Sequence, residues 1–433
     1  MIIYVVNQYP NLSETFIARE IEGLRDHGVS VTVVSLKKVG AALPRPALPP
    51  RRHRQGEPPS PSGKQRPPDD RSASPGSVQF REASPALIPP AALSIASLRA
   101  QLRFLCRKPA AYLSLLPKIA VRESKTPVGI LRGVRRFLQA AALAREIRRL
   151  NPIRIHAQFA HVTADAGQVL SALLDLPFSV SVHAWDIYTQ PPGKIERRVG
   201  DADFVVACTQ HGAAHLQDLL GEKLHAPVHL MHHGLPVAEF TPATPDSHRR
   251  ILAIGRLIAK KGLSDLIEAC SQLAENGLQF QCTIVGEGPE YENIKAKIDE
   301  SGLSDRIVLT GAKTQEEVRE ALLTTTVFVL PSVVDEDGDR DGLPNVILEA
   351  MACGIPVVTT TASAADEAVG NDRTGLLVPP HDPTALAAAI QQLLENPGRA
   401  RDLGHAAREK AKAKFDLAKT IPPLAELLLR GNQ

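Results

Sequence analysis

The sequence predicts an α/β protein of two doubly wound domains, in each of which helices cover a parallel sheet. Short apolar runs such as Met1–Val6 and Val327–Leu330 are typical of buried strands. They alternate along the chain with helical patterns, as expected for parallel βαβ units. The chain has 433 residues, of which 43% are apolar, so it can build more than one core. A polar, proline-containing stretch at 241–248 marks the expected boundary between domains 1–240 and 241–410.

The composition argues against several classes of protein. The formal net charge of +3 is too small to indicate nucleic-acid binding by itself. The five cysteines form no C-x-x-C pair, so we expect neither a zinc site nor disulfides, and a reducing cytoplasm is the simpler location. The opening MIIYVV lacks a basic lead, and no run of eighteen apolar residues exists, so we expect neither a signal peptide nor a membrane span.

The N-terminal domain opens with a βαβ pattern. Strand Met1–Val6 is followed by a turn-rich loop, a helix over Glu14–Asp26 and a strand over Val29–Leu36. Ligands bind at the carboxyl ends of strands in such sheets, so the loop that carries Ser13 and Glu14 is a candidate site wall. The alternative for both residues is ordinary capping of the helix that follows.

Two segments of this domain differ in composition from the rest. Residues 41–90 contain thirteen prolines and few large apolar residues, which predicts a disordered insertion. Residues 91–150 read as basic helices, with thirteen Lys or Arg against two Glu. Leu98, Leu102 and Leu105 form an apolar stripe beside Arg99 and Arg103. Such helices can lie on anionic membranes, and a solvated cationic face is the alternative.

A candidate ligand site lies in the second domain at 335–356, DEDGDRDGLPNVILEAMACGIP. A strand precedes it, and a helix begins near Pro344 and carries Glu349. Asp341 lies just before this helix, so two carboxylates and a helix N-terminus should flank one pocket. The N-terminus suits a phosphate and the carboxylates suit hydroxyl groups, a combination that a sugar nucleotide provides.

Three further motifs follow expected strands. GRLIAKKG contains Arg256 and Lys261, two cations suited to a diphosphate. The turn GEGP contains Gly286, and HAWD places His183 at a strand end. The adjacent His232 and His233 should point apart, so we expect no metal there.

Together these motifs resemble those of the retaining glycosyltransferases of family 4, which have the GT-B fold. The C-terminal signature of that family is an acid, seven residues, a glutamate and a helix ending in Gly-x-Pro-Val, and here the first acid is Asp341 where the family usually has Glu. The opening YPNLSETFIAREIEGL also looks like that of family members that build exopolysaccharides of the colanic-acid and amylovoran type.

The resemblance implies two Rossmann-like domains facing a cleft, with residues 411–433 returning as a helix to the first domain. It also implies roles for individual side chains. His183 and Asp341 would act at the reacting sugar, and Ser13 and Glu14 would lie on the acceptor side. The donor-binding residues would be Arg256, Lys261, Gly286, Gly342, Leu343, Pro344, Asn345 and Glu349.

We therefore expect a hexosyltransferase that uses a nucleotide-sugar donor and a saccharide or lipid-linked acceptor. No cofactor, metal or nucleic acid is expected, and residues 91–150 are expected either to contact an anionic membrane on its inner face or to present a solvated cationic face. One alternative is a metal-dependent transferase or cation-binding module that uses the acidic loop Asp335–Asp341. Another is a degenerate sugar-nucleotide binder without activity.

Overall fold

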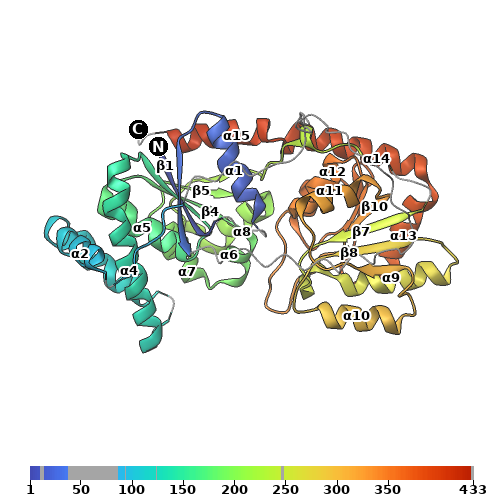
Figure 1. Ribbon diagram of the computed structural model, residues 1–433, viewed down its shortest axis with the longest axis horizontal. Coiled ribbons are helices and arrows are strands. Elements are labelled where there is room, and N and C mark those ends of the chain that lie inside the picture. Colours follow the sequence, from blue (N-terminus) through green and yellow to red (C-terminus); the bar gives the residue numbers. More distant parts are fainter. Residues whose placement is uncertain (10–13, 38–85, 93, 123, 245–247, 431–433) are drawn as a thin grey trace, which may run out of the picture.

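The computed structural model describes residues 1–9, 14–37, 86–92, 94–122, 124–244 and 248–430 (Figure 1). Ser13 and most of the expected insertion 41–90 lie outside these residues. The end of that segment belongs to the fold, because Leu87 exchanges backbone hydrogen bonds with Val33 and Ser35. The expectation of a disordered insertion is therefore wrong for its last few residues.

Six strands form the N-terminal sheet, all parallel, in the order β2-β1-β3-β4-β5-β6. They are β1 (Ile2–Gln8), β2 (Val31–Lys37), β3 (Arg154–Gln158), β4 (Phe178–Val182), β5 (Phe204–Ala207) and β6 (Val228–Leu230). The helices of this half are α1 (Thr15–Asp26), α2 (Ile95–Arg107), α3 (Pro109–Ala120), α4 (Pro127–Ile147), α5 (Val162–Leu174), α6 (Ala184–Thr189), α7 (Pro192–Val199) and α8 (Gln210–Leu220).

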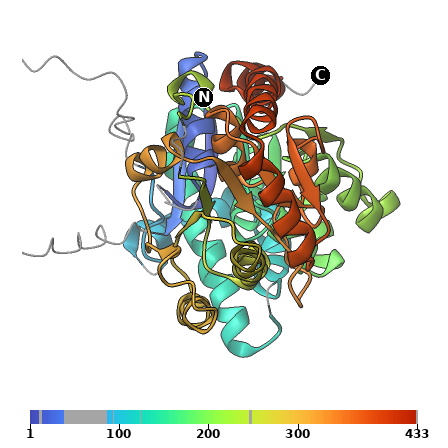
Figure 2. The same cartoon turned by 90° about the vertical axis from the view of Figure 1, so that its right-hand side faces the viewer.

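The C-terminal sheet is also six-stranded and parallel, in the order β12-β11-β10-β7-β8-β9. Its strands are β7 (Arg250–Ile254), β8 (Gln281–Val285), β9 (Ile307–Leu309), β10 (Val327–Leu330), β11 (Val357–Thr360) and β12 (Gly375–Val378). Its helices are α9 (Leu263–Glu275), α10 (Tyr291–Glu300), α11 (Gln315–Leu323), α12 (Asn345–Ala352), α13 (Pro383–Glu395) and α14 (Pro397–Lys410). Figure 2, in which this half faces the viewer, shows helices on both sides of the sheet.

Alternation along the strands explains the layers. In β1, Ile3 and Val5 pack into the core with α2–α5, whereas Ile2, Tyr4 and Val6 pack on the other face with α1. That second face also receives the last helix, α15 (Leu417–Leu429), which runs back from the C-terminal half (Figure 1). Both faces of each sheet are therefore covered, as parallel sheets require.

The boundaries between the halves differ in detail from those expected. Leu235 and Phe240, which the sequence places in the first domain, pack in a core of the second. Ala411 and Phe415 pack in the same core, so the return to the N-terminal sheet begins only after them, at Leu417. Two short helices that the sequence pattern does not predict, α6 and α7, follow β4.

The strand orders fix where a ligand can bind. Each sheet reverses its winding once, between β1 and β3 in the first half and between β7 and β10 in the second. Ligands of doubly wound sheets bind outside the carboxyl ends of the strands at this reversal. The segment after β7 contains Arg256 and Lys261, and the segment after β10 contains Asp341, so both predicted charge groups converge on one switch point.

Two glycines allow loops at this switch point to approach closely. Gly262 has φ +63°, and a Cβ built there would lie 1.8 Å from the carbonyl oxygen of Pro331. Gly286 has φ +153°, and its Cβ would lie 1.8 Å from the carbonyl oxygen of Gly255. No other residue fits either position, so these glycines set the shape of the loops at this switch point.

None of the helices described is both long enough and apolar enough to cross a bilayer.

Candidate active site

A cleft of 1020 Å³ runs between the two halves and is lined by both. The N-terminal wall holds aromatic and imidazole side chains together with several charged ones, whereas the C-terminal wall consists mainly of the acidic loop, its lysines and the start of α12. The first wall includes Glu14, Phe16, Arg19, Phe159, His161, His183, Trp185, Cys208 and His233. The second includes Gly255, Arg256, Lys260, Lys261, Lys313, Asp339, Asp341, Gly342, Leu343, Pro344, Asn345 and Glu349.

Asp341 lies at the centre of the C-terminal wall. Its Oδ2 accepts hydrogen bonds from Lys261 Nζ at 2.6 Å and from the Ser332 hydroxyl at 2.8 Å. Lys260 Nζ lies 2.8 Å from Asp339 Oδ2 and 3.7 Å from Asp341 Oδ1. Burial alone would raise the pKa of Asp341, but the two ammonium groups outweigh it and hold the pKa below its usual value. Asp341 is therefore an anion at neutral pH.

Helix α12 begins directly after Pro344, so its first backbone N–H groups have no partner within the helix. Gly342–Asn345 bring this end of the helix to the cleft wall. Glu349 is buried, and its Oε1 accepts a hydrogen bond of 2.7 Å from Arg19 Nη2 of α1. This ion pair joins the two walls, because α1 belongs to the N-terminal half.

His183 follows β4 on the opposite wall and is buried. Its ring lies 4.2 Å from that of Phe159 and 5.3 Å from that of His233, centre to centre. Burial lowers the pKa of His183 well below its ordinary value, and His233 lowers it further. Burial also lowers the pKa of His233, to about 3. Both imidazoles are therefore neutral and can accept as well as donate hydrogen bonds.

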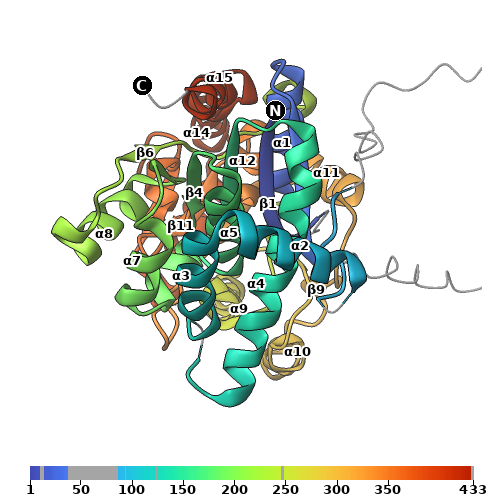
Figure 3. The ribbon, with the colours of Figure 1, turned by 90° about the vertical axis from the view of Figure 1, so that its left-hand side faces the viewer.

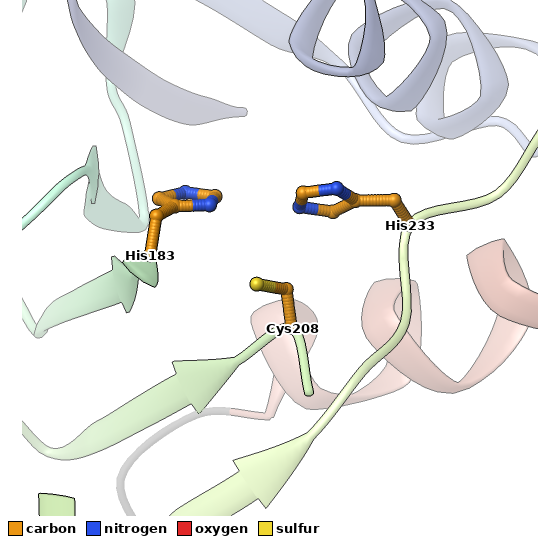
Figure 4. Close-up of side chains that lie close together, drawn as sticks. All are labelled: His183, Cys208 and His233. Atoms are coloured by element: carbon orange, nitrogen blue, oxygen red, sulfur yellow. The ribbon is translucent and has the colours of Figure 1, made fainter. Parts of the chain in front are cut away.

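Figure 4 shows His183, Cys208 and His233 converging on one point, and one ligand atom from each lies within 4.8 Å of the others. Among the residues described, this is the group that could hold a metal ion. His183 is also hydrogen-bonded to Gln158, and His233 to Asn345, so protein partners already hold both rings. His232 and His233 point apart, as expected, because His232 Nε2 lies 2.9 Å from Glu367 and His233 stacks on Phe16.

The cleft brings together most of the predicted site residues. It is lined by Glu14, His183, Arg256, Lys261, Asp341, Gly342, Leu343, Pro344, Asn345 and Glu349. Ser13 lies outside the described residues. Gly286 does not line the cleft in the part of the chain described; it packs on Gly255, while the next two residues line a smaller pocket of 500 Å³ with Thr310 and Gly311.

Sequence reasoning missed several residues at this site. Arg19 was not singled out, because its partner Glu349 lies 330 positions away along the chain. Lys260 and Lys261 are adjacent, and nothing in the sequence showed that both would contact the acidic loop. Glu20 and Gln158, which stand behind His183, gave no motif signal.

Fold and site define a GT-B protein with a charged pocket facing an imidazole-rich wall, and two family models match the chain. The model for glycosyl transferases group 1 matches residues 238–410, and that for Glycosyltransferase Family 4 matches residues 92–239. The chain belongs to the family 4 glycosyltransferases, as its motifs predict.

Two relatives show where the sequence similarity lies. The chain is 39% identical over 201 residues to a putative colanic acid biosynthesis glycosyltransferase of Escherichia coli, covering 45% of this chain and 49% of that protein. It is 38% identical over 181 residues to an amylovoran biosynthesis glycosyltransferase of Erwinia amylovora, covering 42% and 44%. The matches thus span about half the length of these relatives.

Solved structures of low sequence identity share the fold. Sucrose-phosphate synthase from Thermosynechococcus elongatus aligns with a TM-score of 0.66 at 20% identity, covering 98% of this chain and 97% of that one. Anabaena HepE in complex with UDP and glucose also aligns with a TM-score of 0.66, at 16% identity, covering 99% and 98%. The GT-B architecture predicted from the sequence is confirmed.

Proposed function

We propose that the protein is a retaining, metal-independent hexosyltransferase that moves a sugar from a nucleotide-sugar donor to a saccharide or lipid-linked saccharide acceptor. The process would be exopolysaccharide or other cell-surface glycan synthesis, at the cytoplasmic side of the membrane. The observation that carries the proposal is the facing pair of walls: fixed cations and carboxylates at the switch point of one sheet, and the neutral His183 opposite them.

The C-terminal wall would bind the donor. Arg256, Lys261 and the first N–H groups of α12 would meet the charge that grows on the leaving nucleoside diphosphate. Asp341 would accept from sugar hydroxyls, and Glu349 from the ribose. The pocket lined by Thr310 and Gly311 adjoins Lys313 in sequence and is a candidate site for the base. His183, with Glu14, would position the acceptor hydroxyl beside the anomeric carbon.

The contacts of the acidic loop disfavour the alternative of a cation-binding module. Asp339 and Asp341 are paired with Lys260 and Lys261, so two ammonium groups stand where a hard cation would have to bind. Asp337 Oδ1 accepts from the backbone N–H of Asp339 within the loop. Full transfer activity in EDTA would support the metal-independent proposal, and activity lost in EDTA but restored by manganese would contradict it.

A thermal-shift screen of UDP-, GDP- and ADP-sugars, followed by a transfer assay with the stabilising donor, tests the function. A bound donor should raise the melting temperature, because a ligand of the native state stabilises it by mass action. Arg256→Ala should abolish most of the shift, whereas Lys295→Ala, on the exposed face of α10, should leave it unchanged. No shift with any donor, or equal shifts in both variants, would contradict the proposal; a shift without transfer would favour a degenerate binder.

The helices α2–α4 form the outer end of the N-terminal half, and we propose that they contact an anionic membrane (Figure 3). On α2, Ile95, Leu98, Leu102 and Leu105 are each at least 40% exposed, so the apolar stripe does not face the core. The buried face consists of Ser97, Ala100 and Phe104. Exposed Arg99, Arg103 and Arg107 flank the stripe on its other side. An exposed apolar stripe beside a row of cations suits an anionic lipid surface.

Co-sedimentation with vesicles of neutral lipid, with and without anionic lipid, tests the membrane contact. The double variant Leu98→Ser, Leu102→Ser should lose most of the binding to anionic vesicles. Val308→Ser, which changes an equally exposed residue of the other half, should not. Equal, negligible binding to both kinds of vesicle would contradict the contact without affecting the proposed transfer activity.

A further inference from the structure

A chain of hydrogen bonds runs through the N-terminal half behind His183. The Tyr4 hydroxyl, on β1, donates to Glu20 Oε1 of α1 at 3.1 Å. Gln158 Nε2, at the end of β3, donates to the same oxygen at 2.7 Å. The other end of the Gln158 amide, Oε1, lies 3.1 Å from His183 Nε2. Gln158 is 1% exposed, so water does not compete for these contacts.

The chemistry of each group fixes the direction of this chain. An ionised carboxylate only accepts, so the amide of Gln158 must turn its NH₂ group toward Glu20. Its carbonyl oxygen then faces the imidazole and can only accept. His183 Nε2 must therefore carry a proton and donate it. Because the ring is neutral, Nδ1 is left without a proton and accepts hydrogen bonds.

We propose that Glu20, acting through Gln158, is a positioning residue that holds His183 in its Nε2–H tautomer, in which Nδ1 can accept the backbone N–H of Asp186 in the capping box of α6, and so fixes the ring at the cleft wall. The effect on transfer rests on the proposed function, but the tautomer does not. Neither Glu20 nor Gln158 lines the cleft, so both act on the reaction only through His183. If the Gln158 amide were reversed, its carbonyl oxygen would face the Glu20 carboxylate and its NH₂ group would face the His183 ring. The NH₂ group would then donate to Nε2, which favours the tautomer with the proton on Nδ1.

Protonation of Glu20 should release this constraint. Burial raises the pKa of Glu20 from 4.5 to about 7, although the hydrogen bonds from Tyr4 and Gln158 oppose the rise. The titratable groups that face it are the Tyr4 hydroxyl from β1 and the Cys208 thiol after β5, and burial raises the pKa of both. Glu20 is therefore the group of this set that titrates near neutrality. The ionised form, present above about pH 7, is the one that orients the amide.

The tautomer can be measured without any substrate. Selective ¹⁵N labelling of histidine, with His183→Gln to assign its signals, reports which ring nitrogen carries the proton. At pH 8 we expect His183 of the wild type to be protonated at Nε2. Glu20→Gln should shift a large part of the population to the Nδ1–H form, whereas Glu22→Gln, on the same helix, should not. Identical tautomer populations in the wild type and Glu20→Gln would overturn the proposal.

The pH dependence of transfer gives a second, independent readout. In the wild type, kcat should rise through about pH 7 as Glu20 ionises, and Glu20→Gln should lose this limb and at least about tenfold of kcat at pH 8, with the KM for the donor unchanged. Tyr4→Phe is the variant to use if Glu20→Gln does not fold. It removes one hydrogen bond that stabilises the carboxylate, so the limb should move to higher pH. If kcat still rose near the wild-type pH in both variants, the proposed action of Glu20 on His183 through Gln158 would be contradicted.

Failure of this inference and failure of the proposed function have different signatures. If no donor supports transfer but the His183 tautomer depends on Glu20, the positioning role of Glu20 is supported and the proposed function is contradicted. If transfer proceeds and depends on His183, but Glu20→Gln behaves like the wild type in both assays, the proposed function is supported and the positioning role of Glu20 is contradicted.

Discussion

The two halves of the molecule are both six-stranded parallel sheets, divided two and four about the reversal in the first and three and three in the second, and they present different side chains to the cleft. Each sheet reverses its winding once, and each uses the loops at that reversal as its wall. On the C-terminal side these loops carry Arg256, Lys261 and Asp341, whereas on the N-terminal side they carry Phe159 and His161 beside His183. Two doubly wound sheets thus give one wall that carries cations beside a buried carboxylate and another that carries aromatic and imidazole side chains. Function follows from the loops rather than from the topology.

The largest expected effect is on the C-terminal wall. Lys261→Met should lower kcat by about 100-fold, because a fixed charge at the leaving diphosphate would be lost. Asp341 would keep Lys260 as a partner, so the ligand-free protein should melt close to the wild-type temperature. Steady-state kinetics and a thermal melt measure both quantities. A decrease in kcat of less than about threefold would contradict the proposed contact of Lys261 with the donor diphosphate.

The N-terminal wall should give a different kinetic pattern. His183→Gln should lower kcat by about tenfold or more, while the Kd of the nucleotide donor stays within about twofold of the wild type. The reason is that His183 lies across the cleft from the cations that would hold the diphosphate. Calorimetric titration of the donor into His183→Gln and into Lys261→Met measures how much each wall contributes to donor affinity. Equal weakening of donor binding in both variants would contradict the division of roles.

Gly262 tests whether the loops of the C-terminal switch point are packed as described. Gly262→Ala should lower the free energy of unfolding by about 3 kcal/mol or more, because its Cβ meets the Pro331 carbonyl and φ is +63°. Gly28→Ala is the matched control, with φ +85° but no atom within 4 Å of the added Cβ. It should cost only about 1 kcal/mol. Denaturant unfolding measures both changes, and equal losses of unfolding free energy in Gly262→Ala and Gly28→Ala would contradict the close approach of Gly262 to Pro331.

The N-terminal half should also carry most of a pH-dependent change in stability. Burial raises the pKa of Glu20 and that of Asp186 to about 7, so the folded state binds more protons than the unfolded state between their ordinary values and pH 7. The free energy of unfolding should therefore fall as the pH rises from about 5 to about 7, by on the order of 2 kcal/mol per group. Glu20→Gln and Asp186→Asn should each flatten this slope in urea titrations. An unchanged slope in both would contradict the assigned pKa values.

The smallest expected effect concerns the ion pair that joins the walls. Arg19 donates to Glu349, which is the residue proposed to bind the ribose, so a donor must compete with this contact. Arg19→Met should tighten donor binding by about two- to fivefold, as expected for one partly buried ion pair. Glu349→Gln should weaken it. Titration calorimetry with the preferred donor measures both, and weaker binding in Arg19→Met would instead make Arg19 part of the donor site.

Much of the architecture could be predicted because local patterns determine it. Apolar runs between helical stretches indicated the strands, and the predicted strand Val327–Leu330 and helix Glu14–Asp26 match β10 and α1 to within one residue. The short α6 and α7 escaped notice, because segments of six and eight residues show little periodicity. Residues 235–240 and 411–415 pack in the C-terminal half and not with the N-terminal half as expected. Their packing partners lie far away in the sequence, so local patterns do not show this.

The sequence by itself determined the fold and the identity of the charged groups, because strand patterns and short motifs depend on neighbouring residues. Only the tertiary structure decided the partners of those groups. It placed Arg19 on Glu349, both lysines on the acidic loop, and Glu20 behind His183 through Gln158. These contacts join segments separated by as few as 25 and as many as 330 positions, and such pairings form only when whole sheets and helices pack.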